Sequence, residues 1–204
     1  MNAAEASRNL ELIRTLMERT TQYQLLTARA GLAAGSLAGV GALSFLFLDA
    51  RNPWSFGAVW ASVFFGSLLA TCIGTVLRSR EQGERIWSRP ARAVVRALAP
   101  SLFAALVLSV MFFAWGGEAY LWLPGVWMLC YGQGALATAA YAPAPIRSLG
   151  LSVLLLGAVS LWLGPQWAVV MMGLVFGAGH IGLGLALLVR ERRQQTVRLH
   201  RSVA

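Results

Sequence analysis

The side chain whose type and position best suit a chemical role is that of His180. It is the only ionisable residue in an apolar stretch near residues 167–189, and helical spacing puts it on one face with Gly173, Gly177 and Gly184. Small residues let another helix approach closely, so this pattern predicts that His180 points at a packed neighbour. An imidazole in that position can form a buried hydrogen bond, bind a metal or haem iron, or serve as the base beside a nucleophile.

Two side chains of another apolar stretch, near residues 119–141, are expected at the depth of His180. Counted from the inner end of its own stretch, His180 lies ten residues in, Gln133 eight and Cys130 eleven. At about 1.5 Å per residue these depths agree within a few ångströms. We therefore predict buried polar packing by these three residues, with a hydrogen bond from His180 to Gln133 that joins two helices.

Metal and haem chemistry have weaker support in the sequence. The second histidine, His200, lies in the basic tail, and the two cysteines, Cys72 and Cys130, have no metal-ligand spacing. We predict no metal site and no cofactor. Because a dimer would supply two copies of His180, a redox protein that binds haem or quinone at this residue stays an alternative.

The sequence also lacks the residues that an enzyme's active site would need. A cysteine in the fourth apolar stretch and a histidine in the sixth resemble the layout of rhomboid proteases, but where those enzymes have Gly-x-Ser-Gly this chain has Gly132, Gln133 and Gly134. A thiol in apolar surroundings such as Cys130 is unreactive without a nearby charge. We predict no catalytic residue and no enzymatic activity.

Composition identifies the elements that must position these side chains. Of 204 residues, 57% are apolar and only 12% are charged, against about 25% charged in soluble domains, which argues against a soluble globular protein. Six apolar runs reach the roughly 20 residues that a membrane span needs. We predict an all-α bundle of six transmembrane helices near residues 29–48, 55–77, 98–115, 119–141, 146–163 and 167–189.

Charge sets the expected orientation. All 17 basic residues are arginines, and every one except Arg51 falls in the N-terminal segment, residues 78–96, Arg147, or the tail. The positive-inside rule then predicts cytoplasmic N and C termini in a bacterial inner membrane. The juxtamembrane arginines are expected to contact anionic lipid headgroups and not nucleic acid: Arg78, Arg80, Arg89, Arg92, Arg96, Arg190, Arg192 and Arg193.

The expected organisation has three parts. Residues 1–28 have the apolar spacing of a cytoplasmic amphipathic helix, residues 29–189 form the transmembrane domain, and residues 190–204 form a basic cytoplasmic tail. Ser88 is expected to cap a short interfacial helix before the third span. Five tryptophans mark the predicted outer membrane boundary: Trp54, Trp115, Trp122, Trp162 and Trp167.

The first span has one nearly flat face. Gly31, Gly35 and Gly39 recur every four residues, which predicts close packing against another helix. That helix belongs either to the same chain or to a second copy, so a homodimer stays open.

Four segments carry a resemblance to a known family: 12–19 (LIRTLMER), 123–134 (LPGVWMLCYGQG), 148–165 and 176–184 (FGAGHIGLG). Together they resemble an uncharacterised bacterial family of six-span membrane proteins. Genes of that family often neighbour winged-helix regulators, so the resemblance implies a regulatory context and no catalytic residue. We expect a non-enzymatic regulatory or accessory module that contacts lipid, with a second copy of the chain or a soluble regulatory protein as its candidate partner. A small-molecule transporter or channel is the other alternative, although no carboxylate lies near mid-membrane to couple ions.

Overall fold

The computed structural model of the chain describes residues 26–83 and 85–203, with side chains through Arg193. Every regular element in these residues is helical, so the all-α prediction is confirmed. The predicted amphipathic helix of residues 1–28 lies almost entirely outside the described residues. The elements are α2 (Ala28–Ser44), α3 (Pro53–Gln82), α4 (Arg89–Trp115), η1 (Ala119–Trp122), α5 (Leu123–Ala137), α6 (Ala144–Leu163), η2 (Pro165–Trp167), α7 (Ala168–Met172), η3 (Gly173–Ala178) and α8 (Gly179–Val203).

Four helices in the described part of the chain are long and apolar enough to cross a membrane. They are α3, α4, α6 and the run Pro165–Arg193, which joins η2, α7, η3 and the first part of α8. The other two helices are shorter: α2 has 17 residues and α5 has 15. Turns take up residues 45–47, and the 3-10 turn η1 precedes α5, so the predicted first and fourth spans are only partly α-helical.

Local sequence explains where the helices begin and end. The side chains of Thr27, Asn52 and Ser88 accept backbone N–H groups at the starts of α2, α3 and α4, as N-cap residues do. The capping role of Ser88 is confirmed, but α4 continues from it directly through the predicted third span, so no separate interfacial helix forms. Gly83 ends α3 in the left-handed conformation that glycine adopts without strain.

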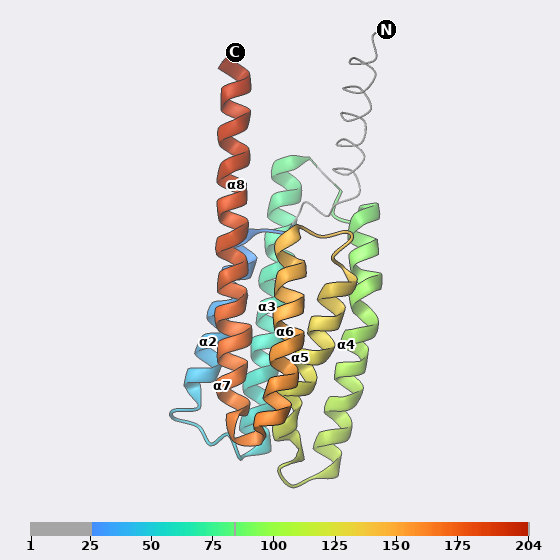
Figure 1. The fold of residues 1–204 in the computed structure, drawn as a ribbon, viewed down its shortest axis with the longest axis vertical. Coiled ribbons are helices and arrows are strands. Elements are labelled where there is room, and N and C mark those ends of the chain that lie inside the picture. The colour runs from blue at the N-terminus through green and yellow to red at the C-terminus, as the bar shows by residue number, and fades with distance from the viewer. Residues whose placement is uncertain (1–25, 84, 204) are drawn as a thin grey trace.

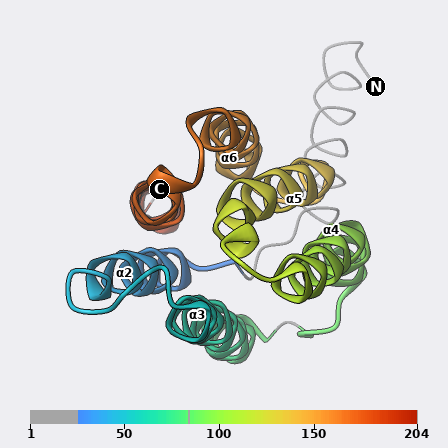
Figure 2. The ribbon, with the colours of Figure 1, turned by 90° about the horizontal axis from the view of Figure 1, so that it is seen from below.

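The helices pack as two groups of three. In the first, which we call the α2 group, α2 lies between α3 and the η3–α8 run; in the second, the α5 group, α5 lies between α4 and α6. Figure 2 shows these groups down the bundle. Backbone contacts between the groups are less extensive and lie mainly along one edge, where α5 and α6 meet α7, η3 and α8.

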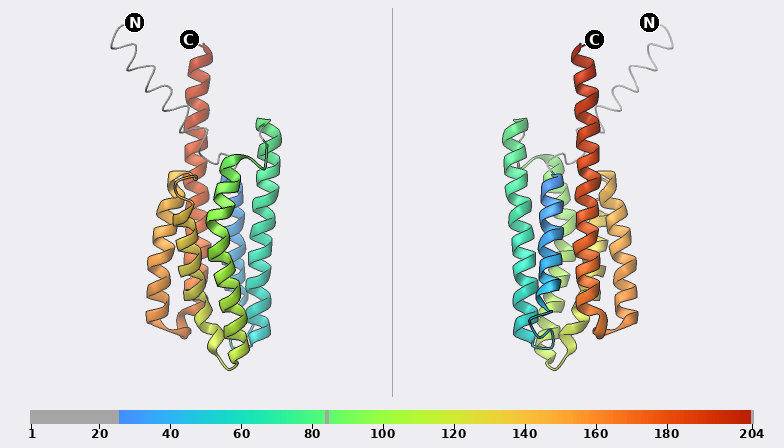
Figure 3. Two further views of the ribbon diagram at one scale, coloured as in Figure 1. Left: turned by 90° about the vertical axis from the view of Figure 1, so that its right-hand side faces the viewer. Right: turned by 90° about the vertical axis from the view of Figure 1, so that its left-hand side faces the viewer.

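The bundle has two distinct ends. At the basic end lie the connections 83–88 and 138–143 and the projecting part of α8, and at the far end lie the connections 45–52, 116–118 and 164 (Figure 1). Helix α8 extends well beyond its neighbours at the basic end (Figure 3). Among the described arginines only Arg51 falls at the far end. The bundle is therefore polarised in charge.

The outer faces of α3 and α4 are apolar and exposed. Helix α4 buries only Ala91, while large side chains such as Phe103, Leu106 and Val110 are more than 60% exposed. On α3, Phe65 and Leu69 are similarly open. Exposed apolar surface of this extent marks contact with lipid or with another protein.

Candidate functional site

His180 is held between its own helix and α5. Its Nε2 atom lies 2.8 Å from the hydroxyl oxygen of Tyr131 in α5, and its Nδ1 atom lies 2.9 Å from the carbonyl oxygen of Phe176, one turn earlier. The Phe176 ring stacks on the imidazole, with centroids 5.8 Å apart and planes 19° apart. The histidine therefore joins the α2 group to the α5 group through a polar bond.

The bonding partners determine which atoms donate. A backbone carbonyl can only accept, so Nδ1 must carry a proton that it donates to Phe176. In the neutral imidazole Nε2 is then the acceptor, and Tyr131 donates its hydroxyl proton to it. Both ring nitrogens of His180 are thus used in holding helices in place.

This geometry corrects the predicted partner of His180. Gln133 lies on the same helix as Tyr131, but its side chain is exposed, and the bond goes to Tyr131 instead. The depth estimate pointed to the right part of α5. It failed on the face, because two residues along a helix rotate the side chain by about 200°. Cys130 is partly buried and carries a free thiol.

Haem or metal ligation at His180 does not fit this arrangement. Iron would need the Nε2 lone pair that accepts the Tyr131 proton, so ligation would first break the bond between the two groups. Among the described residues no cluster of three or more His, Cys, Asp or Glu side chains could hold a metal ion. Cys72 and Cys130 are free thiols on different helices, α3 and α5.

A π-helical segment, η3, directly precedes His180. Such a segment makes i to i+5 hydrogen bonds, is uncommon, and often occurs near functional positions. The backbone N–H of Gly179 donates to the carbonyls of Leu174 and Phe176, and the His180 imidazole adds a side-chain donor to Phe176. The histidine therefore helps to satisfy backbone groups of the irregular segment.

The glycines predicted to pack do so against one another. A methyl group on Gly31 would lie 3.0 Å from Cα of Gly184, and one on Gly35 would lie 2.6 Å from the carbonyl oxygen of Gly177. Likewise, a methyl group on Gly173 would lie 2.6 Å from Cβ of Ala42. The helix that covers the flat face of α2 is thus η3–α8 of the same chain. Gly39 is the looser member, because a methyl group there would meet nothing within 4 Å.

A second glycine interface joins α5 to α6, and sequence reasoning missed it. A methyl group on Gly132 would lie 2.6 Å from the backbone nitrogen of Leu154, and one on Gly157 would lie 3.0 Å from that of Leu129. The signal was present as two pairs at seven-residue spacing, Gly125 with Gly132 and Gly150 with Gly157.

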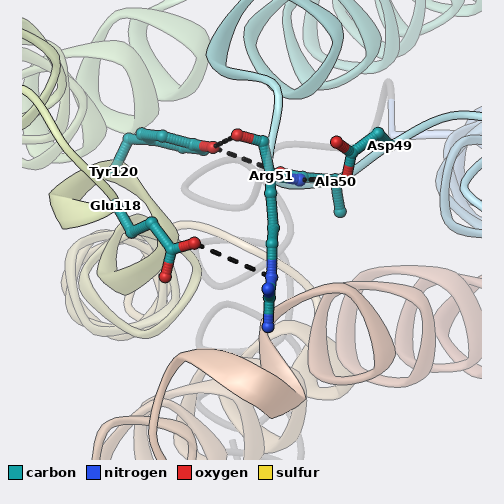
Figure 4. A network of polar contacts seen from close by, with 5 residues as sticks. All are labelled: Asp49, Ala50, Arg51, Glu118 and Tyr120. Carbon is teal, nitrogen blue, oxygen red and sulfur yellow. Dashed lines mark hydrogen bonds and ion pairs between the residues drawn. The ribbon is translucent and has the colours of Figure 1, made fainter.

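At the far end, an aromatic and polar cluster joins the two groups. Tyr120 is 1% exposed, and its hydroxyl donates to the carbonyl of Arg51, in the connection between α2 and α3. The Arg51 side chain lies 3.7 Å from the carboxylate of Glu118 (Figure 4). The Phe56 ring lies between those of Tyr120 and Trp127, with centroids 5.2 and 6.1 Å away. This far-end cluster fixes α3 against η1 and α5.

The arginines predicted to contact lipid fall into two kinds. Arg78 forms an ion pair with Glu191 that links α3 to α8, and the two side chains are only 18% and 27% exposed. Arg78 is therefore a structural residue. The others lie at the basic end of the bundle: Arg80 on α3, Arg89, Arg92 and Arg96 on α4, and Arg190, Arg192 and Arg193 on α8.

Comparison with protein-family models, with curated proteins and with solved structures finds no match for this chain. The resemblance to a six-span bacterial family accordingly stays a prediction that rests on its four sequence segments.

Proposed function

We infer that the chain is a six-span integral protein of a bacterial inner membrane, with both termini cytoplasmic, that acts as a non-enzymatic regulatory or accessory module. Four helices meet the length and apolarity of a span, and α2 and α5 lie between them in the bundle. These two elements are short as α-helices because turns follow α2 at residues 45–47 and the 3-10 turn η1 precedes α5.

One observation carries the proposed role. Helix α8 runs from the bundle into a projection beyond the basic end (Figure 3), while His180 and Tyr131, two polar residues between the helix groups, are used in holding helices together. His180 and Tyr131 thus have a structural role, and the basic part of α8 projects from the bundle. That projection and the arginines of α4 are suited to anionic headgroups and to an acidic surface on a soluble protein.

The orientation is tested by cysteine labelling in intact cells, in a background with Cys72→Ala and Cys130→Ala. A membrane-impermeant maleimide should label Arg51→Cys from outside, and should label Arg85→Cys only after permeabilisation. A reporter fused after Ala204 should be active in the cytoplasm. The reverse labelling pattern would overturn the proposed orientation.

The role is tested by native mass spectrometry of protein extracted gently from its own membranes. We expect anionic lipid and a soluble protein to be retained, and both to be weakened when Arg190, Arg192 and Arg193 are changed to Gln. Arg51→Gln, at the far end, is the matched control and should change neither. A retained non-lipid small molecule without a protein partner would favour the transporter alternative.

A further inference from the structure

The helices pack more closely within each group of three than between the two groups. Within each group of three helices, glycines bring backbones into direct contact: Gly35 against Gly177 in the α2 group, and Gly132 against Leu154 in the α5 group. Between the groups, no comparable packing joins α3 to α4, although these helices are consecutive in the chain and neighbours in Figure 2. Each group is therefore stiffer than the connection between them.

The far end holds the two groups together. Gly57 of α3 faces Phe113 of α4, where an added methyl group would lie 3.3 Å from the ring. The Phe113 ring stacks on that of Tyr120 with centroids 5.4 Å apart, and Tyr120 bonds the connection before α3 (Figure 4). The far-end cluster has the character of a hinge, because several rings and a backbone bond converge there.

Toward the basic end the polar link between the groups is one hydrogen bond, which lies beside the apolar contacts of α6 with α8 and next to the irregular segment η3. Tyr131 of α5 donates to His180 of α8, and both side chains are only partly buried. The π-helical η3 that precedes His180 contains Gly173 and Gly177. A π segment can convert to α-helix with a shift of one residue, so α8 can change its position against α5 without unfolding.

We propose that the α2 group and the α5 group rock about the far-end cluster, with the Tyr131–His180 bond as the catch that keeps the basic end closed. The Arg78–Glu191 pair ties α3 to α8 within the α2 group, so α3 moves with α8 and the separation appears between α3 and α4. This device is independent of whether a soluble protein binds the projection of α8.

Distances between spin labels in lipid nanodiscs test the device, in a background with Cys72→Ala and Cys130→Ala. One pair, Arg80→Cys with Arg92→Cys, reports the basic end of α3 and α4. A second pair, Trp54→Cys with Trp115→Cys, reports the far end; all four residues are exposed. Tyr131→Phe removes the hydroxyl that forms the catch and keeps the ring. Thr138→Val is the matched control, because it removes a side-chain hydrogen bond to the carbonyl of Ala135 within the α5 group.

In Tyr131→Phe, a longer distance at the basic end should become about threefold more populated, the effect of losing an average hydrogen bond between helices in a bilayer. The far-end pair should not change, and Thr138→Val should match the parent at both ends. An unchanged basic-end distribution, or equal broadening at both ends, would overturn the proposal. His180→Gln gives a second route if Tyr131→Phe is poorly produced, and the same two outcomes apply to it.

Discussion

The two glycine interfaces use the same packing and differ in what surrounds them. Gly132 and Gly157 join α5 to α6 through two regular helices. Gly31 and Gly35 join α2 to a run that contains the π segment η3, and the bond from His180 and the ion pair from Glu191 lie on that same run. Close backbone contact alone does not require an irregular helix. We conclude that the π segment η3 is related to the contact between the α2 group and the α5 group, and not to the glycine packing itself.

The difference predicts unequal tolerance to the same chemical change. Two regular helices in backbone contact lose packing energy when they move apart, since protein interiors are packed to near crystal density. A π segment has an alternative register, so part of an added volume can be absorbed by the helix itself. The substitutions below test this contrast by unfolding in SDS, followed by tryptophan fluorescence.

Gly132→Ala should have the largest effect. Its methyl group would lie 2.6 and 2.8 Å from the backbone N and Cα of Leu154, so α5 and α6 must separate. We expect a loss of about 3 kcal/mol in the free energy of unfolding, the upper part of the range for overpacking. A loss below that of Gly35→Ala would refute the idea that the α5–α6 interface is the stiffer one.

Gly35→Ala should cost less, about 1–2 kcal/mol. The methyl group would meet the carbonyl oxygen of Gly177 and the backbone nitrogen of Ile181 at 2.6 Å, as close a contact as at Gly132. We expect a smaller loss in the free energy of unfolding than for Gly132→Ala because η3, which contains Gly177, can change its register. If hydrogen exchange shows no change in η3 of this variant, the π segment is not what absorbs the strain.

Arg78→Ala should destabilise the α2 group by about 1–2 kcal/mol, because it leaves the mostly buried Glu191 carboxylate without its partner. Arg51→Ala is the comparison at the far end, where the side chains of Arg51 and Glu118 are 78% and 60% exposed. An exposed pair contributes at most about 1 kcal/mol, and often nothing measurable. Equal losses in the two variants would show that burial does not distinguish the pairs.

Gly39→Ala and Gly182→Ala should have the smallest effects. Nothing lies within 4 Å of a methyl group at either position, and alanine favours helix over glycine by up to about 1 kcal/mol. Unchanged or slightly raised stability is expected. A marked loss at Gly39, which follows Gly31 and Gly35 in the same series, would mean that the face of α2 is packed more tightly than its geometry indicates.

Sequence reasoning was most successful where one property decides the outcome. Apolar length located both ends of α6 and the C-terminal end of α4, and residue size on one face identified Gly31 and Gly35 as packing positions. The capping role of Ser88 followed from side-chain chemistry. Each of these depends on local sequence or on the simple demand for apolar surface.

Sequence reasoning failed where two helices had to be placed against each other. Choosing Gln133 over Tyr131 as the partner of His180 required the rotation of α5, which depth along the helix does not give. The π segment was also not anticipated, because its hydrogen bonds compete with α-helical ones by small energies that tertiary packing decides. The Arg78–Glu191 pair joins residues far apart in the chain, and no local pattern marks it.

The partner of α2 has a consequence for how the chain is made. Helices α5 and α6 are consecutive, so their glycine interface can close as a hairpin soon after both emerge from the ribosome. The flat face of α2 must wait for α8, whose Gly184 is the contact of Gly31. Contacts between such distant residues form late and slow folding. Until α8 has been made, the glycine face of α2 therefore lacks its packing partner, and the bundle is completed only when its last described helix is in place.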